Sequence, residues 1–536
     1  MAIDRRGFLK ASAAAGLSLP WIAACRSSAW RGGPEAGGPF RHGVASGDPL
    51  DDRVILWTRV TPEGDEDVEV EWRLARDPAL RDEVARGSLM AHASRDHTVK
   101  VDALGLEPGT TYYYWFRALG HASPTGRVRT APVGATDRLR IAFCSCSNIA
   151  FGHFNAYGLI ARRADLDAVV HLGDYLYEYK NGEYGDGTEL GRAPQPDREL
   201  VTLNDYRTRH AQYKRDPDLQ ELHRQHPFIG VWDDHESAND AWLDGAENHH
   251  PQAGEGDWPT RKASAVRAYQ EWMPIREVHA DRRGRIYRSF RFGDLADLIM
   301  LDTRLHGRDR QVANTQDVKS IADPRRSILG REQEAWLLAE LTESSRSDVA
   351  WRVIGQQVMF AQLVSKEGFI WNPDQWDGYP NSRERVLEHL ASQRIDNAIV
   401  LTGDIHSSWA NDISPDPFTP ASYDPRDGRG SLAVELITPG VTSPGIASPE
   451  RASARRREIL ERHPHVRWVD LHRRGYGLLD IDRERAQGEW WFVDTVSQRW
   501  LGESFAAGFR TASGRNHLER VSGPSPPRET APALAP

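Results

Sequence analysis

The feature that most constrains the fold is a series of short apolar runs, each followed directly by acidic or other polar residues. Short apolar runs bounded by Gly and charged residues are typical of buried β-strands. Segments with helical periodicity lie between the runs, and this alternation predicts an α/β fold, with helices packed on its sheets. The apolar runs are 139–143, 168–172, 228–232, 298–301 and 398–401, and the candidate helices are 332–344 and 382–392.

A different periodicity precedes this region. Apolar and charged residues alternate over 68–74, which is the pattern of a half-buried strand. The segment 106–112 resembles the tyrosine corner of fibronectin-type sandwiches, in which a Tyr hydroxyl bonds nearby backbone. We therefore predict a small fibronectin/Ig-like β-sandwich domain over residues 40–132.

Length, charge and cysteine count narrow the classes of fold and function that the chain can belong to. The 536 residues exceed the roughly 100–200 residues of one domain, so we expect a large α/β domain over residues 133–520. The Pro- and Ser-rich segment 521–536 is expected to be a disordered tail. The net charge of -9, without a polybasic block, argues against binding to duplex nucleic acid. Three cysteines are too few for a disulfide-stapled scaffold, and no apolar run approaches the ~20 residues of a membrane-spanning helix.

Residues 1–39 have the features of an export signal followed by a linker. Arg5 and Arg6, followed by Gly7-Phe8-Leu9-Lys10 and an Ala-rich run, resemble a twin-arginine signal. Such a signal implies export by the twin-arginine translocation machinery to the periplasm or cell envelope. Cys25 follows Ile22-Ala23-Ala24 in the pattern of a lipobox. The sequence leaves open whether Cys25 is an acylated membrane anchor or a chance match.

Acidic residues follow two of the apolar runs. Gly173 permits a sharp turn at a strand end, and Asp174 behind it has two oxygens that can bridge two cations. Asp233, Asp234 and His235 follow a later strand. Two buried like charges raise one pKa strongly, so a bound cation is the more favourable arrangement. The alternatives are ordinary polar turns, and the apolar residues before Asp233 argue against an exposed one.

Two further strand ends supply candidate ligands. Asp404 and His406 stand two residues apart, so both side chains point the same way, and this pair suits iron, zinc or manganese. Cys146 is likewise in line with Cys144, and a disulfide between them would be strained. Cys146 is therefore either a small core residue or a thiolate whose pKa a metal lowers.

These segments belong to a longer series of motifs. The series comprises Phe40-x-His42-Gly43-Val44-Ala45-Ser46-Gly47-Asp48-Pro49, Trp57-Thr58-Arg59, Ser145-Cys146, His171-Leu172-Gly173-Asp174-Tyr175-x-Tyr177-Glu178, Trp232-Asp233-Asp234-His235-Glu236, Leu301-Asp302-Thr303-Arg304, Trp376-Asp377-Gly378-Tyr379-Pro380 and Gly403-Asp404-x-His406-Ser407-Ser408. In content, order and spacing it resembles the PhoD-type alkaline phosphatases, a branch of the calcineurin-like metallophosphoesterases. The resemblance covers nearly the whole chain after Phe40. It implies a metallophosphoesterase sheet sandwich for the α/β domain, and it agrees with export through Arg5 and Arg6.

The resemblance also implies a site that holds Fe3+ and Ca2+, with Zn2+ or Mn2+ as the alternative. Asp174 would bridge to calcium, Asp234 and Asn239 would lie on the calcium side, and His235 would face the substrate. The iron ligands would be Cys146, Asp174, Tyr177, Asp404 and His406. The sequence departs from the common family pattern at Cys144, where Ala or Ser is usual, and in the looser match after His235. The second departure makes Asn239 the least secure ligand.

The expected function is that of an exported alkaline phosphatase that hydrolyses phosphate monoesters, and diesters in addition, at two metal ions. His235 and Asp174 are the expected catalytic residues, and His235 could donate a proton to the leaving alkoxide. Arg304 and Arg383 are candidates for binding phosphate oxygens. An exposed, salt-bridged arginine is the competing and favoured interpretation of Arg383.

Two other functions remain in view. The first is a phosphodiesterase with phospholipase D-like activity on phospholipid or nucleotide diesters, which would need the same metals and a different pocket. The second is a non-catalytic β-sandwich binding protein with a degenerate enzyme domain. None of the expected ligand types is missing, which argues against the second. The sequence leaves the natural substrate and the oligomeric state open.

Overall fold

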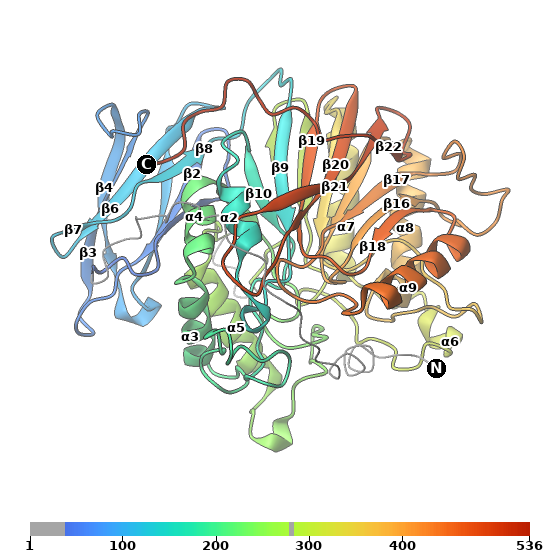
Figure 1. Ribbon diagram of the computed structural model, residues 1–536, viewed down its shortest axis with the longest axis horizontal. Coiled ribbons are helices and arrows are strands. Elements are labelled where there is room, and N and C mark those ends of the chain that lie inside the picture. The colour runs from blue at the N-terminus through green and yellow to red at the C-terminus, as the bar shows by residue number, and fades with distance from the viewer. Residues whose placement is uncertain (1–37, 278–283) are drawn as a thin grey trace, which may run out of the picture.

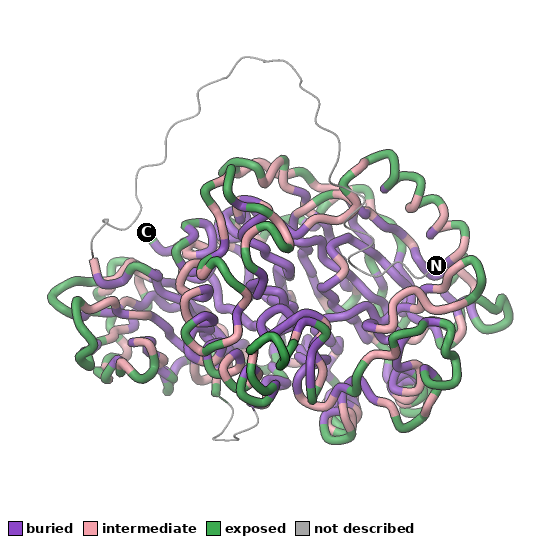
Figure 2. Tube along the Cα trace, turned by 90° about the horizontal axis from the view of Figure 1, so that it is seen from below, coloured by how far each residue is buried: buried purple, intermediate pink, exposed green. Residues whose placement is uncertain are grey.

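The computed structural model describes residues 38–277 and 284–536. Two large sheets pack against each other, with helices on their outer faces, and a smaller sheet stands at one end (Figure 1). One apolar core joins the two large sheets and includes Phe143 and Val170 of one with Ile399 and Leu436 of the other. Buried chain accordingly runs through the centre of the molecule, and exposed chain lies in the peripheral loops (Figure 2). This arrangement is the predicted α/β sheet sandwich.

The larger sheet has ten strands. They are β1 Val44–Gly47, β2 Arg53–Arg59, β5 Thr98–Leu104, β9 Leu139–Cys144, β10 Ala168–His171, β11 Pro227–Gly230, β19 Gly475–Ile481, β20 Arg485–Val493, β21 Glu503–Ala512 and β22 Glu519–Val521. Their order is β22-β21-β20-β19-β9-β10-β11-β1-β2-β5. The central strands β9, β10, β11 and β1 pair in parallel, and antiparallel strands extend the sheet on both sides.

The second sheet has seven strands and also has a parallel centre. They are β12 Arg288–Phe292, β13 Ala296–Met300, β14 Trp351–Gln356, β15 Ala398–Thr402, β16 Ser408–Ile413, β17 Ala433–Ile437 and β18 Val466–Asp470, in the order β12-β13-β14-β15-β17-β16-β18. The strands β13, β14, β15 and β17 pair in parallel. All the apolar runs predicted as strands are thus confirmed, to within two residues at each end.

Helices cover both large sheets (Figure 1). Beside the ten-stranded sheet lie α2 Asn155–Ala161, α3 Leu203–Tyr213, α4 Pro217–Gln225 and α5 Trp258–Trp272. Beside the seven-stranded sheet lie α7 Gly330–Arg346, α8 Pro380–Gln393 and α9 Pro449–Arg462. The connections contain α6 Val318–Ile321 and the 3-10 turns η1 Ala93–Arg95, η2 Ile149–Phe151, η3 Pro251–Ala253 and η4 Trp376–Gly378. Leu337 and Leu341 of α7 lie one turn apart, as do Val386 and Leu390 of α8, and all four join one buried cluster. Both predicted helices are confirmed.

The N-terminal region forms the predicted β-sandwich, but one of its layers is continuous with the ten-stranded sheet. That layer is β1, β2 and β5, and β1 pairs in parallel with β11. The facing layer is a five-stranded sheet of β3 Val68–Ala75, β4 Glu83–Ala91, β6 Thr111–Ala118, β7 His121–Ala122 and β8 Gly126–Arg129. A separate core lies between the layers. The Tyr112 hydroxyl accepts a hydrogen bond from the backbone N–H of Glu107 at 2.8 Å, as expected for a tyrosine corner.

The C-terminal segment differs from its prediction of disorder. It returns to the N-terminal region, and the chain ends beside β6 and β8 (Figure 1). Tyr113 donates its hydroxyl hydrogen to the carbonyl of Ala533 at 2.6 Å, and Gln225 and Ala535 exchange two hydrogen bonds of 3.0 and 2.8 Å. Arg528 pairs with Asp167 at 2.5 Å. The composition missed this order because side chains remote in sequence satisfy the backbone of a segment that has few apolar groups of its own.

Within 38–277 and 284–536, no helix is long and apolar enough to cross a membrane. The sequence features assigned to export, Arg5 and Arg6, and the lipobox residue Cys25 lie outside the residues that the structure describes.

Candidate metal centre

Ligating side chains gather where the carboxyl ends of strands from both large sheets meet. The turns after β9, β10 and β11 bring in one set, and the turn after β15 brings in the other. Three groups form, each with ligand atoms within 4.8 Å of one another and every member buried: Cys146, Asp174 and His406; Asp174, Asp234 and His235; and Asp233, Asp234 and Asp404. The structure therefore brings together the residues that the sequence predicted from separate strand ends.

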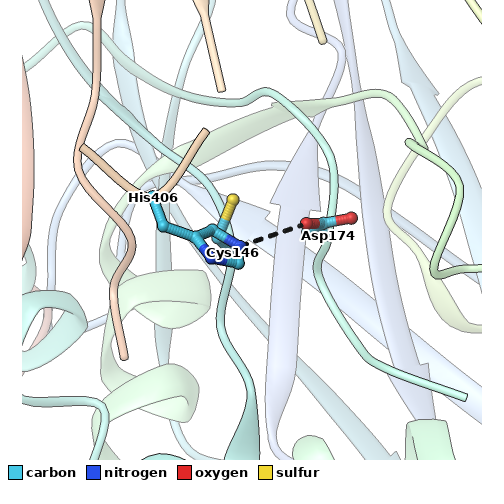
Figure 3. A group of neighbouring side chains, drawn as sticks. All are labelled: Cys146, Asp174 and His406. Carbon is cyan, nitrogen blue, oxygen red and sulfur yellow. Dashed lines mark ion pairs between the residues drawn. The ribbon is translucent and has the colours of Figure 1, made fainter. Parts of the chain in front are cut away.

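The first group comes from three segments that are remote in sequence (Figure 3). His406 Nε2 lies 3.8 Å from Asp174 Oδ2, the ion pair drawn in Figure 3. The Tyr177 hydroxyl donates to Asp174 Oδ2 at 2.8 Å and lies 3.0 Å from His406 Nε2. Ser443 donates its own hydroxyl hydrogen to the Tyr177 oxygen at 2.8 Å. A phenol, a thiol, a carboxylate and an imidazole thus surround one point.

Asp174 belongs to two of the three groups. One carboxylate therefore faces two adjoining ligand sets, one that contains sulfur and nitrogen and one that is richer in oxygen. Asp233 has a buried oxygen, Oδ2, without a hydrogen-bond partner among the described residues. A buried carboxylate oxygen is normally paired or bound to metal. The donor set therefore fits bound metal, and Asp174 is common to two of its ligand groups.

The backbone at the ligands is unusual. Cys146, Asp174, Asp404 and His406 have φ values of 61°, 56°, 59° and 54°. This left-handed conformation costs a residue with a Cβ roughly 1–2 kcal/mol. It persists where the surroundings impose it, and such residues cluster at functional sites.

Two residues join the turn after β10 to the turn after β11. Glu236 accepts hydrogen bonds from the backbone N–H groups of Asp174 at 3.2 Å, Tyr175 at 2.5 Å and Asp233 at 2.7 Å. Gly173 has a φ of 103°, and a Cβ there would lie 2.4 Å from the Cβ of Asp233. The close approach of these turns places Asp174 beside Asp233.

The electrostatics of the cluster favour a bound cation. Burial and then the Asp174 carboxylate raise the pKa of the Cys146 thiol and of the Tyr177 phenol well above their usual values. Burial also raises the pKa of Asp233, and Asp234 adds to this effect, although Arg304 opposes it. The protein alone therefore holds protons on these acids, whereas a cation among them would favour their ionised, ligating forms.

The imidazole ring of His235 lies beside the acidic ligands of the second group and carries a positive charge. Its Nδ1 lies 2.7 Å from Glu178 Oε2, and its ring lies 4.3 Å, centroid to centroid, from that of Tyr177. Burial opposes a charge on the ring, but the carboxylates of Asp234 and Glu178 outweigh burial and raise the pKa of His235 to about 10. The imidazole therefore keeps its proton at neutral pH.

Arg304 lies in the cluster, but carboxylates occupy its guanidinium. It is fully buried and pairs with Asp233 at 2.5 Å and Asp374 at 2.7 Å, and it lies 3.5 Å from Asp404. Burial opposes the charge of Asp374, yet Arg304 and Arg308 hold its pKa down at about 2. Arg304 therefore neutralises acidic residues of the site. Its Nη2 has no hydrogen-bond partner among the described residues, so the phosphate-binding role expected from the sequence stays a prediction.

The other predicted residues fall outside the three groups. Arg383 pairs with Asp377 at 2.6 Å and donates to the carbonyl of Phe360. It is therefore salt-bridged, as the competing interpretation had it, but it is buried rather than exposed. The Asn239 amide nitrogen donates to Glu247 at 2.8 Å, and its backbone N–H donates to Glu178 at 2.8 Å, which places it beside the site.

Both described cysteines are free thiols, so no disulfide joins Cys144 to Cys146. Cys144 is buried in the main core, where its Sγ lies 3.9 Å from the carbonyl of Val170. It is a small core residue at the end of β9 and belongs to none of the three ligand groups.

Several site residues received no role from the sequence. Glu178 and Glu236 stand inside the quoted motifs, and their position next to candidate ligands was the available signal. Ser443 and Asp374 follow no motif, and only the folded chain brings them to Tyr177 and Arg304.

Comparisons with known proteins agree with this geometry. Two family models match, one described as PhoD-like phosphatase over residues 141–490 and one as PhoD-like phosphatase, N-terminal domain, over residues 25–132. "Alkaline phosphatase D" of Bacillus subtilis (strain 168) is 35% identical over 543 residues, which cover 97% of this chain and 89% of that protein. A solved structure described as "Structure of PhoD" matches with a TM-score of 0.83 at 34% identity, over 92% of this chain and 94% of the other.

Proposed function

Because the chain belongs to the PhoD-like phosphatase family and is a phosphoric ester hydrolase, we propose that it acts at a binuclear metal centre as an alkaline phosphatase. Phosphate monoesters are the proposed main substrates, with diesters in addition. The observation that carries this proposal is the position of Asp174, which is shared by two adjoining groups of buried ligands.

We propose Fe3+ on the side of Cys146 and Tyr177, and Ca2+ on the other side. A thiolate and a phenolate require a strongly charged cation to offset their burial, and iron accepts sulfur, nitrogen and oxygen ligands. His406 and Asp404 would complete the iron set. Ca2+ prefers oxygen ligands in irregular geometry, which suits Asp174, Asp234 and an amide such as that of Asn239. Zn2+ or Mn2+ is the alternative.

Residues of the protein itself have separate roles in the reaction. When bound, the two cations would hold phosphoryl oxygens and lower the pKa of the attacking water. His235 faces the same cluster, and its proton can pass to the leaving alkoxide oxygen. Glu178 holds the His235 ring by its Nδ1, which leaves Nε2 as the donor atom. Arg304 balances the surplus negative charge of the acidic groups.

Metal analysis combined with Asp174→Ala tests the proposal. Native protein should contain iron and calcium, with a visible absorption band from tyrosinate-to-iron charge transfer. Asp174→Ala should lose the metals, the band and nearly all turnover of a monoester, because both ligand sets lose a member. Asp65→Ala, a change at an exposed site, is the control and should retain all three. Full activity in Asp174→Ala would refute the site.

The same preparation separates the substrate classes. A model monoester should be hydrolysed faster than a model diester. Faster hydrolysis of phospholipid or nucleotide diesters would instead assign the chain to the phosphodiesterase alternative.

We further propose export by the twin-arginine route, supported by Arg5 and Arg6 with the Phe8-Leu9-Lys10 sequence behind them. Replacing both arginines by lysine should leave the protein in the cytoplasm. Envelope localisation of that variant would contradict the route. Cys25→Ser tests the lipid anchor, because an acylated protein should move from the membrane fraction to the soluble fraction.

A further inference from the structure

The phosphoryl oxygens that metals would not hold need a cation in addition to His235, which is assigned to the leaving group. Of the two predicted arginines, Arg304 is paired with Asp233 and Asp374, and Arg383 is paired with Asp377. The carboxylates beside Arg304 and Arg383 already balance the charge of each guanidinium, which weakens its attraction for a phosphate dianion. A substrate-binding arginine should therefore be one that is near the cluster and has no carboxylate partner.

Arg474 lies close to the ligands through a short chain of backbone contacts. It directly precedes Gly475, whose N–H donates to the carbonyl of Gly440 at 3.2 Å. The segment after Gly440 lines the metal centre, because the Ser443 N–H donates to the carbonyl of Cys146 at 3.1 Å. Ser443 also bonds the Tyr177 hydroxyl. The start of β19 is thus held against the wall of the site.

The side chain of Arg474 is partly buried, but it has no carboxylate partner among the described residues. Its Nε is buried without a hydrogen-bond partner, and none of the described carboxylates forms an ion pair with its guanidinium. Burial lowers the pKa of Arg474, and Tyr184 is the one titratable group that acts in the opposite direction. A desolvated Nε–H without a partner is unfavourable, and an anionic ligand bound to the guanidinium would offset that cost.

Tyr184 connects Arg474 with the reacting groups. Its hydroxyl lies 3.4 Å from His406 Nδ1. Its ring stacks beside those of His235 and His406, with centroids 6.3 and 6.5 Å apart. Tyr184 therefore belongs to the wall of the site that holds His235 and His406.

The preceding arginine shows the contrast. Arg473 is exposed, pairs with Asp470 at 2.9 Å, and lies 4.2 Å over the ring of Phe492. Adjacent residues with the same side chain thus have opposite surroundings, one paired at the surface and one unpaired beside the metal centre.

We propose that Arg474 is a substrate-binding residue that holds a phosphoryl oxygen of the anionic ester. This inference rests on the proposed phosphatase function. A guanidinium can bind two phosphoryl oxygens in its planar fork, and a monoester dianion offers more charge to it than a diester does.

The test compares Arg474→Ala with Arg473→Ala in metal-loaded protein. The Kd of inorganic phosphate, measured by calorimetry, and the KM of a monoester should both rise about 10- to 100-fold in Arg474→Ala, the usual effect of losing a charged hydrogen bond. Its kcat should stay within about threefold and its metal content should not change. Arg473→Ala should match the native protein. Arg474→Lys keeps the charge without the fork, and should show a smaller rise in both constants.

Unchanged phosphate affinity in Arg474→Ala and Arg474→Lys would overturn the assignment, as would loss of metal in both. The two proposals fail separately. Native protein that binds phosphate through Arg474 but hydrolyses no ester would refute the phosphatase function and leave the anion site standing.

Discussion

At the scale of single residues, the site depends on buried charges that fix one another. His235 keeps its proton because Asp234 and Glu178 outweigh the cost of burial. Glu178 in turn accepts from the backbone of Asn239 at 2.8 Å, so it is held on both sides. A carboxylate in this position sets the orientation and the proton affinity of the imidazole.

Glu178→Gln tests that role. Removing one negative charge lowers the pKa of His235, so the proton donor is lost at a lower pH than in the native protein. Activity should therefore decline earlier on the alkaline limb of the pH–kcat profile, with kcat at pH 9 reduced about 10- to 100-fold. Bound cations lower the same pKa in both proteins and leave the direction of the difference unchanged.

Glu183→Gln is the matched control, since Glu183 is exposed in the segment that follows. It should keep the native profile. An alkaline limb in Glu178→Gln that coincides with that of the native protein would show that His235 is not the acid.

At the scale of elements, the turns that end the parallel strands make the site. Four ligand residues adopt the left-handed conformation there, and Glu236 ties the turn after β10 to the turn after β11. Gly173 has two reasons to be glycine, its φ of 103° and its contact with Asp233. The strands supply rigid supports, and the turns direct the ligands inward.

Gly173→Ala should separate the two turns. The added methyl group would overlap the Cβ of Asp233, and the positive φ adds strain, for a loss of about 2–4 kcal/mol in the free energy of unfolding. Gly182→Ala is the matched control, because Gly182 has a φ of 80° with nothing within 4 Å of the added Cβ. It should lose only about 1 kcal/mol.

Denaturant unfolding measures both changes, and metal analysis follows the ligands. Gly173→Ala should also bind metal more weakly, whereas Gly182→Ala should not. Equal stability and equal metal content in the two variants would show that the close approach of the turns is unimportant.

At the scale of the whole molecule, contacts between distant parts of the chain hold the N-terminal region, the ten-stranded sheet and the C-terminal segment together. The β-sandwich of the N-terminal region shares a layer with the ten-stranded sheet. The C-terminal segment then crosses back to this region, where Tyr113 and Gln225 bond its last residues. Asp167, which Arg528 contacts, precedes β10, whereas the metal centre follows the other end of that strand, so this contact lies away from the metal centre.

Removal of residues 527–536 should therefore reduce stability without affecting catalysis. The lost bonds, including the pair of Arg528 with Asp167, should lower the Tm by about 2–4 °C for each kcal/mol lost. The kcat/KM for a monoester should be unchanged. Arg520→Ala, at an exposed position in β22, is the control and should keep the native Tm. A large fall in kcat/KM would show that the segment supports the site.

Local sequence patterns were enough to predict the strands, the helices and the candidate metal ligands named above. Apolar runs and helical spacing predicted the strands and helices, because burial of one face requires a regular period. The residue types after the strands predicted metal ligands, and the structure brings Cys146, Asp174, Tyr177, Asp404 and His406 to one point or next to it. Asp234 and His235 join them in the second group.

Only the tertiary structure decided what depends on partners remote in sequence. Arg304 and Arg383 carry the same charge in the sequence, and only the folded chain shows the carboxylates that balance each of them. Arg474 stood in no motif, and it became a candidate because folding buried it without a partner. The physical reason is common to all three: the sequence shows that a side chain is charged, but the contacts that satisfy the charge exist only once the sheets have packed.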